Sequence, residues 1–291
     1  MNRLLKKIRD FGLLFTIDTT DDTEILTISR ALKRAHLPLI LLPYSGSTPD
    51  DHLRSVNEKE DLFIGADCLS SPSKIEKSYA SGAHFAVCNS FEETGLQALK
   101  NRGYDFYMRV KSLDDVLKAI SGGAAALIIN SDSTDCDELI RHLTTKYHHP
   151  FFLEGEFCKD KIKPWQLHPE FIAFISRLPS PSRDPKIVEI EASIVLRNFL
   201  GIRFRSLSLT EDSSRLGEGA TMASLSGIPL FREAQRDCLE LETDDMDRTI
   251  AYLKWCNIFM DPLTAKIKDN CILSTELYDD FLGWPVRLIS R

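Results

Sequence analysis

The chain has 291 residues, of which 43% are hydrophobic and 27% charged, and its formal net charge at pH 7 is −7. This is the composition of an ordinary globular protein, and the acidic balance argues against nucleic acid, which requires a clustered basic face. No apolar run is long enough to cross a bilayer, and the seven cysteines form no CxxC pair, so neither a disulfide framework nor a zinc site is indicated. We therefore expect a cytoplasmic protein with free thiols and with no metal, cofactor, nucleic-acid or membrane partner.

Residues 1–180 alternate strand and helix patterns. Helical patterns, with Asp, Ser or Pro near several starts and Gly near several ends, separate eight short apolar runs. These runs predict buried strands at 12–17, 37–43, 61–66, 84–89, 105–110, 124–130, 150–155 and 171–176. Eight strands in this length fit a (β/α)8 TIM barrel better than an open doubly wound sheet, since the stretch FTIDTTDD after the first strand has no glycine.

The sequence changes character after LPSPSRD (178–184), a Pro- and Ser-rich stretch that predicts a linker. A helix followed by several strands occurs twice in residues 184–291, which predicts a small α+β domain of βαβββ type. The first set comprises a helix at 186–201 and strands at 201–209, 220–226 and 228–234. The second comprises a strand at 238–243, a helix at 244–256 and strands at 257–261, 270–278 and 285–290.

The stretch DLFIGADCLSSPSKIEKSYASGAHFAV (61–87) reads as strand, helix and strand, the unit of a parallel sheet. It resembles the third and fourth strands of the 2-keto-3-deoxy-6-phosphogluconate and 2-keto-4-hydroxyglutarate (KDPG/KHG) aldolase family, whose pattern is IGAGTVL, a helix, then AGAxFIVSP. The resemblance implies a TIM barrel over residues 1–180, an enzyme that works through a Schiff-base lysine, and a homotrimer. Residues 184–291 resemble the vicinal-oxygen-chelate (glyoxalase-like) family, most closely in LETDDMDRTIAYLKWCNIFMD and FLGWPVRLISR.

The charged groups of the aldolase family are missing at the positions that match it. The resemblance assigns the family's lysine to Ile128 in ALIINSD, its acid/base glutamate to Leu41 in LPLILLPYSG, and its first-strand arginine to Thr16 in LFTID. No lysine lies between Lys118 and Lys146, so a small shift of the alignment does not supply one. We therefore expect a divergent family member that retains none of the catalytic residues.

The family's phosphate site is also missing. Its glycine-rich turns after strands seven and eight let backbone N–H groups approach the anion. The matching turns here are LEGEF, in which Glu154 and Glu156 would repel a phosphate, and AFISRL, which has no glycine. The apolar pattern of the scaffold survives while the pocket features are lost.

Polar residues at the ends of the predicted strands are candidates for a replacement site, because barrel active sites lie at these ends. Arg109, Lys111 and Arg177 could form a new anion site for a small organic acid. Solvated or salt-bridged charges are the commoner outcome, with Asp114 and Asp115 available as partners. Lys111 could also be a displaced Schiff-base lysine, although its polar turn opposes the necessary fall in pKa. The candidate pocket residues are Asp67, Asn89, Arg109, Lys111, Asn130 and Arg177.

The C-terminal half lacks the ligands that the vicinal-oxygen-chelate family uses for its metal. It contains no histidine, and Arg287 in GWPVRL stands where the family has a ligand glutamate. Cys238 occupies another ligand position. Strand carboxylates remain, but such side chains are usually solvated, so no metal is expected. The remaining carboxylates are Glu240, Glu242 and Glu276.

Three functional hypotheses follow. The first, which we favour, is an aldolase-like protein without Schiff-base activity that binds a small organic acid or serves as a scaffold for a protein partner. The second is a different lyase chemistry in the same pocket. The third is a class I KDPG/KHG aldolase that releases pyruvate by means of a relocated lysine. Loss of an essential nucleophile costs several orders of magnitude in rate, so overall similarity does not outweigh it.

Overall fold

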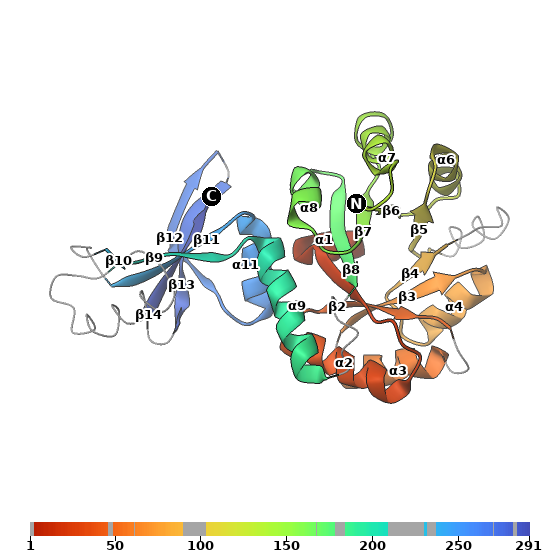
Figure 1. The fold of residues 1–291 in the computed structure, drawn as a ribbon, viewed down its shortest axis with the longest axis horizontal. Coiled ribbons are helices and arrows are strands. Elements are labelled where there is room, and N and C mark those ends of the chain that lie inside the picture. Colours follow the sequence, from red (N-terminus) through yellow and green to blue (C-terminus); the bar gives the residue numbers. More distant parts are fainter. Residues whose placement is uncertain are drawn as a thin grey trace. The chain divides into compact units, whose positions relative to one another are not determined.

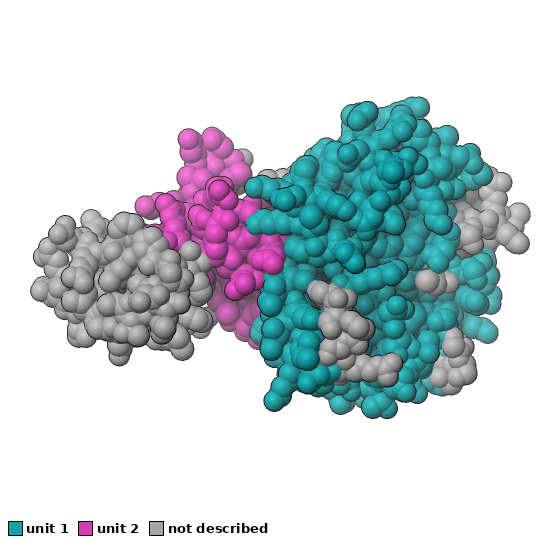
Figure 2. Space-filling view, in the orientation of Figure 1, with its two compact units in different colours: residues 1–195 teal, residues 196–291 magenta. Residues whose placement is uncertain are grey.

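The computed structural model describes residues 3–45, 49–60, 62–89, 103–166, 168–177, 184–208, 230–231, 237–269, 271–281 and 284–291. It divides into two compact units, residues 1–195 and 196–291, shown in different colours in Figure 2. The predicted linker falls on residues 178–184, of which only the last is described, so that domain boundary stays a prediction. No described helix is long and apolar enough to cross a membrane.

Unit 1 is a closed barrel of eight parallel strands, in which β1 pairs with both β2 and β8 (Figure 1). All eight predicted strands are confirmed, and the fold is the expected (β/α)8 TIM barrel. The strands are β1 (Leu13–Thr16), β2 (Leu39–Pro43), β3 (Phe63–Leu69), β4 (Phe85–Cys88), β5 (Phe106–Val110), β6 (Ala126–Asn130), β7 (Phe151–Gly155) and β8 (Phe171–Arg177).

Helices surround the barrel strands in Figure 1. Several begin on residues suited to that role: the side chains of Asp21, Ser71 and Ser112 each accept a hydrogen bond from a backbone N–H in the first turn. The predicted helix between β4 and β5 lies almost entirely outside the described residues. The described helices are α1 (Arg3–Phe11), α2 (Asp22–Arg34), α3 (Pro49–Glu60), α4 (Pro72–Ala80), α6 (Leu113–Ser121), α7 (Cys136–His142) with the π-helical turn η1 (Leu143–Tyr147), α8 (Lys159–Gln166) and α9 (Pro185–Leu200).

Unit 2 contains a six-stranded mixed sheet in the order β10-β9-β11-β14-β13-β12. The segment β11-α11-β12-β13-β14 forms one βαβββ module, because β11 pairs parallel with β14 and the other neighbours are antiparallel. The expected small α+β domain is therefore confirmed, although the strand predicted at 220–226 lies outside the described residues. The elements are β9 (Arg203–Ser208), β10 (Leu230–Phe231), β11 (Cys238–Thr243), α11 (Met246–Trp255), β12 (Met260–Lys268), β13 (Cys271–Phe281) and β14 (Trp284–Ser290).

The core of this module lies between α11 and the sheet, where Met246 and Ile250 pack against Leu288. The prediction for β12 was wrong in extent, since the strand continues to Lys268 rather than ending at 261. Pro262 argues against a strand in the sequence, but β12 is at the end of the sheet order and its pairing with β13 shifts register between Asp261 and Lys266, and edge strands and bulges tolerate proline.

Candidate functional site at the barrel mouth

The interior of the barrel is filled by aromatic and aliphatic side chains. The ring centroids of Phe85 and Phe152 lie 5.4 and 5.1 Å from that of Tyr107. Gly65 leaves room for the side chains of Phe85 and Leu41, because a Cβ at Gly65 would lie 2.2 Å from Phe85 Cε2 and 2.7 Å from Leu41 Cδ1. All three rings are fully buried, so the interior is a packed core.

The three positions that the resemblance assigns to the aldolase's charged groups belong to this interior layer. Ile128 pairs in register with Phe152, and since paired residues of neighbouring strands share a face, both point inward. Leu41 contacts the same core, and Thr16 pairs with it in register. Leu41 and Ile128 are fully buried, and neither can form a Schiff base or transfer a proton. The Thr16 hydroxyl is buried without a hydrogen-bond partner among the described residues.

At the carboxyl-terminal ends of the strands, Arg109 of β5 connects three other strand ends. Its Nη1 and Nη2 atoms donate to the two carboxylate oxygens of Asp67, on β3, at 2.5 and 3.0 Å. Nε and Nη2 donate to Glu154, on β7, at 2.7 Å each. Nη1 also donates to Asn89 Oδ1, after β4, at 2.7 Å. These five contacts equal the five N–H donors of a guanidinium group, so every donor is occupied.

We call Arg109, Asp67, Glu154 and Asn89 the mouth cluster; its three charged side chains are largely shielded from water, while Asn89 is exposed. The side chains of Arg109, Asp67 and Glu154 are 19%, 7% and 16% exposed. Burial disfavours the charged guanidinium, but the hydrogen bonds to Glu154 and Asp67 outweigh it, and the pKa of Arg109 is raised above its ordinary value. The arginine is therefore a permanent cation whose charge is more than balanced by two carboxylates.

Cys88, at the end of β4, is not available as a nucleophile beside this cluster. Burial raises the pKa of its thiol to about 12, with a further contribution from Asp67 that Arg109 partly offsets. Because the thiolate is the reactive form of cysteine, Cys88 acts as a core side chain at neutral pH.

The other predicted pocket residues do not join the mouth cluster. Asn130 pairs in register with Glu154, but its side chain is exposed and accepts a backbone N–H in the turn that follows. Lys111 is exposed, and its backbone N–H donates to Asp115 Oδ2 at 3.0 Å. Arg177 is exposed at the end of β8. Three of the six predicted residues therefore come together, namely Asp67, Asn89 and Arg109.

Asp114 and Asp115, named as available partners for Arg109, Lys111 and Arg177, do not pair with Arg109, whose five donors are taken by the mouth cluster. Asp114 pairs with Lys118 at 2.5 Å, within α6, instead of with Arg109. Glu154, which the sequence places where it would repel a phosphate, is instead a principal partner of Arg109. One signal pointed to it: Glu154 follows the buried Phe152 by two residues, so it faces the same interior, where a carboxylate requires a partner.

Unit 2 has a second arginine placed between carboxylates, on its sheet. Arg287 of β14 pairs with Glu240 of β11 at 3.4 Å and with Glu276 of β13 at 3.3 Å. Ser206 Oγ donates to Glu240 at 2.7 Å. We call Arg287, Glu240 and Glu276 the sheet cluster. Within the described part of the chain, no three or more His, Cys, Asp or Glu side chains are grouped in a way that could hold a metal ion.

The barrel has the same fold as several solved aldolases. A 4-hydroxy-2-oxoglutarate/2-dehydro-3-deoxyphosphogluconate aldolase from TTHB1 is 18% identical, with a TM-score of 0.55 over 68% of this chain and 100% of that one. KDPG aldolase from Legionella pneumophila, solved with pyruvate as a covalent carbinolamine, is 13% identical, with a TM-score of 0.59 over 67% and 98%. The aldolase of Zymomonas mobilis ZM4 is also 13% identical, with a TM-score of 0.58 over 67% and 95%.

No protein-family model and no curated protein matches the sequence. At identities of 13–18%, likeness in three dimensions establishes architecture and leaves chemistry to be argued from the site. Residues of unit 1 thus form a barrel with the fold of the KDPG/KHG aldolases.

Proposed function

We propose that this chain is a divergent KDPG/KHG aldolase-like protein that has lost Schiff-base chemistry and acts as a binding or scaffold protein. The observation that carries the proposal is that none of the eight barrel strands contains a lysine. A class I aldolase needs an uncharged amine in its pocket, and the position matched to that lysine holds the buried Ile128.

Lysines in the loops are poor replacements. Lys111 is exposed to solvent and is not enclosed in a pocket beside the mouth cluster. Lys161, at the start of α8, donates to Asp132 at 2.5 Å, and this hydrogen bond raises its pKa, the opposite of what a Schiff-base lysine requires. An aldolase with a relocated lysine is thus only the alternative function. A different lyase chemistry is a second alternative, and it would have to use groups outside the mouth cluster.

Of the two non-catalytic roles, the mouth cluster favours a scaffold over a binder of organic acids at the barrel mouth. An incoming carboxylate would need N–H donors, and all five donors of Arg109 are already used. Asp67 and Glu154 would also repel an anion. An acid could bind there only by displacing one of these carboxylates from a largely buried ion pair.

Borohydride trapping with pyruvate tests the proposal. The full chain is incubated with pyruvate and sodium borohydride, and an active KDPG aldolase is treated in parallel. We expect no mass increase by intact-mass spectrometry and no cleavage of KDPG or KHG, while the active enzyme shows both. A covalent adduct on any lysine would refute the proposal, and peptide mapping with the Lys111→Arg and Lys161→Arg variants would identify the residue.

The glyoxalase-like identity of unit 2, a homo-oligomeric (trimeric) state and a cytoplasmic location are parts of the same proposal. They are supported by the resemblance of the sequence and, for the barrel, by the fold shared with KDPG aldolases. Light scattering coupled to size-exclusion chromatography measures the oligomeric state directly, and we expect a mass of three chains.

A further inference from the structure

A cleft of about 700 Å³ lies outside the barrel, between α7 with η1 on one side and α8 on the other. Its floor is Leu153 of β7, which points away from the interior because its neighbours in the strand, Phe152 and Glu154, point inward. The cleft is therefore separate from the mouth cluster. Its volume is within the range of small-molecule sites.

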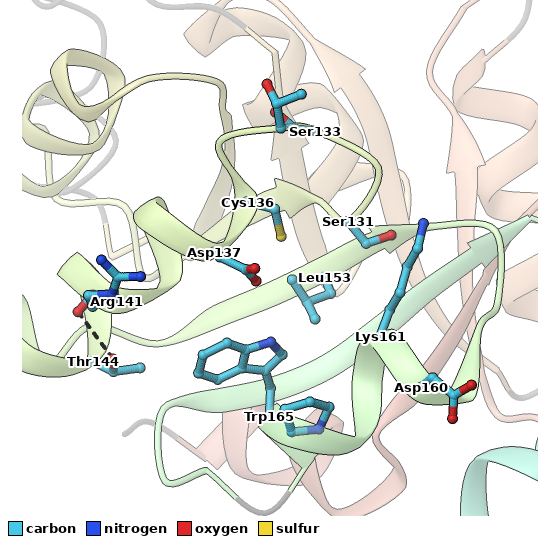
Figure 3. Close-up of a pocket in the computed structure, with 12 residues that line it drawn as sticks. Ser131, Ser133, Cys136, Asp137, Arg141, Thr144, Leu153, Asp160, Lys161 and Trp165 are labelled. Carbon is cyan, nitrogen blue, oxygen red and sulfur yellow. Dashed lines mark hydrogen bonds between the residues drawn. The ribbon is translucent and has the colours of Figure 1, made fainter.

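Apolar groups form the floor of the cleft and part of the wall that α8 contributes. Trp165 and Pro164 of α8 line the cleft together with Leu153, and Figure 3 shows the indole beneath the side chain of Asp137. Cys136 faces the cleft from α7, and burial raises the pKa of its thiol to about 11, so it contributes a neutral surface. A ligand with an apolar, preferably planar, body would fit this part of the cleft.

Two opposite charges on α7 line the same cleft without ion-pair partners among the described residues. Asp137 and Arg141 are four residues apart, on one face of the helix, yet they do not pair with each other, although other pairs at this spacing do, such as Asp114 with Lys118. The second cation of the cleft, Lys161, is already paired with Asp132. A second carboxylate of the cleft, Asp160 of α8, also has no ion-pair partner among the described residues. Of these groups, Asp137 and Arg141 form the opposite-charge pair, about one helical turn apart.

A single small molecule can satisfy both charges if it carries an ammonium and a carboxylate close together. Side chains at this helical spacing have Cβ atoms roughly 5–6 Å apart, which allows both to reach one α-amino acid. The ammonium would lie between Asp137 and the face of Trp165, where a cation is favoured by both the charge and the ring. The carboxylate would pair with Arg141. We propose that this cleft is a binding site for a zwitterion of the amino-acid class with an apolar side chain.

Three matched probes test the assignment on the full chain. L-phenylalanine carries both charges, phenethylamine only the positive one and 3-phenylpropionate only the negative one. Binding is measured by isothermal titration calorimetry and by saturation-transfer NMR. We expect phenylalanine to bind with a Kd of about 1 mM or tighter, and each singly charged probe to bind roughly tenfold more weakly.

Variants then locate the site. Asp137→Asn and Arg141→Gln should each weaken phenylalanine binding by about tenfold or more, since each removes one charged contact. Both residues are exposed, and thermal melts verify folding. Asp114→Asn, an exposed change on α6, is the control and should leave affinity unchanged. Absence of phenylalanine binding at 10 mM (about tenfold above the expected Kd), equal binding of phenethylamine, or binding insensitive to both variants would overturn the proposal.

Discussion

The mouth cluster and the sheet cluster contain the same charges, one arginine and two carboxylates, in different surroundings. In the barrel, Arg109 is 19% exposed and makes two-pronged contacts with each carboxylate at 2.5–3.0 Å. In the sheet, Arg287 is 35% exposed and makes one contact of 3.3–3.4 Å with each. Two-pronged, buried contacts fix geometry, whereas single exposed contacts exchange readily with water.

The difference shows that the two units hold the same set of charges in different ways. The barrel mouth holds polar residues where an active site would lie, and all five N–H donors of Arg109 are used within this cluster. In the sheet cluster, Glu240 and Glu276 are each 18% exposed, but Arg287 is more exposed than Arg109 and its single, longer contacts hold the carboxylates less tightly. The mouth cluster is therefore the more rigidly held of the two, and the sheet cluster the more weakly held.

The largest expected effect is that of Arg109→Met. This change removes the cation and leaves Asp67 and Glu154 as neighbouring, largely buried carboxylates. Breaking a buried ion pair in this way costs about 3–5 kcal/mol of unfolding free energy, and we expect that loss in urea denaturation. Replacing all three charges, by Arg109→Met with Asp67→Asn and Glu154→Gln, should recover much of the stability. A loss below about 1 kcal/mol for Arg109→Met would equate the two clusters and contradict the comparison.

The next effect is that of Ile128→Lys, which restores a lysine at the position matched to the aldolase nucleophile. Position 128 pairs in register with Phe152 on one side and with Arg109 on the other, so the new amine would be buried and close to a cation. Desolvation and like charge both disfavour a charged lysine there. We expect a loss of roughly 3 kcal/mol in unfolding free energy and no pyruvate adduct. Ile128→Met, which keeps volume and polarity, should cost less than about 1.5 kcal/mol. An efficient adduct would mean that the mouth cluster is not an obstacle to aldol chemistry.

The barrel could be predicted from the sequence because strands buried on both faces leave continuous apolar runs. Arg109 and Asp67 could be identified as residues at strand ends, but not as partners. Barrel closure brings β3 and β7, each two strands from β5, within reach of one guanidinium, and nothing in the local sequence reports that distance. Asp115 is closer in the chain, yet it accepts the backbone N–H of Lys111 instead. Pairing across a curved sheet is a property of the fold, not of any segment.

The smallest expected effect is that of Arg287→Met in the sheet cluster. Arg287 is partly exposed and makes single, long contacts, so we assign its ion pairs to the weak class that contributes about 0.2–1 kcal/mol, and the loss in unfolding free energy should lie in this range. Salt separates the clusters further, because mobile ions screen exposed charges much more than buried ones. The cost of Arg287→Met should therefore approach zero in 1 M NaCl, while that of Arg109→Met should persist. Urea denaturation at low and high salt measures both variants side by side. A cost of about 3 kcal/mol for Arg287→Met, unchanged by salt, would show that the sheet cluster is as structural as the mouth cluster.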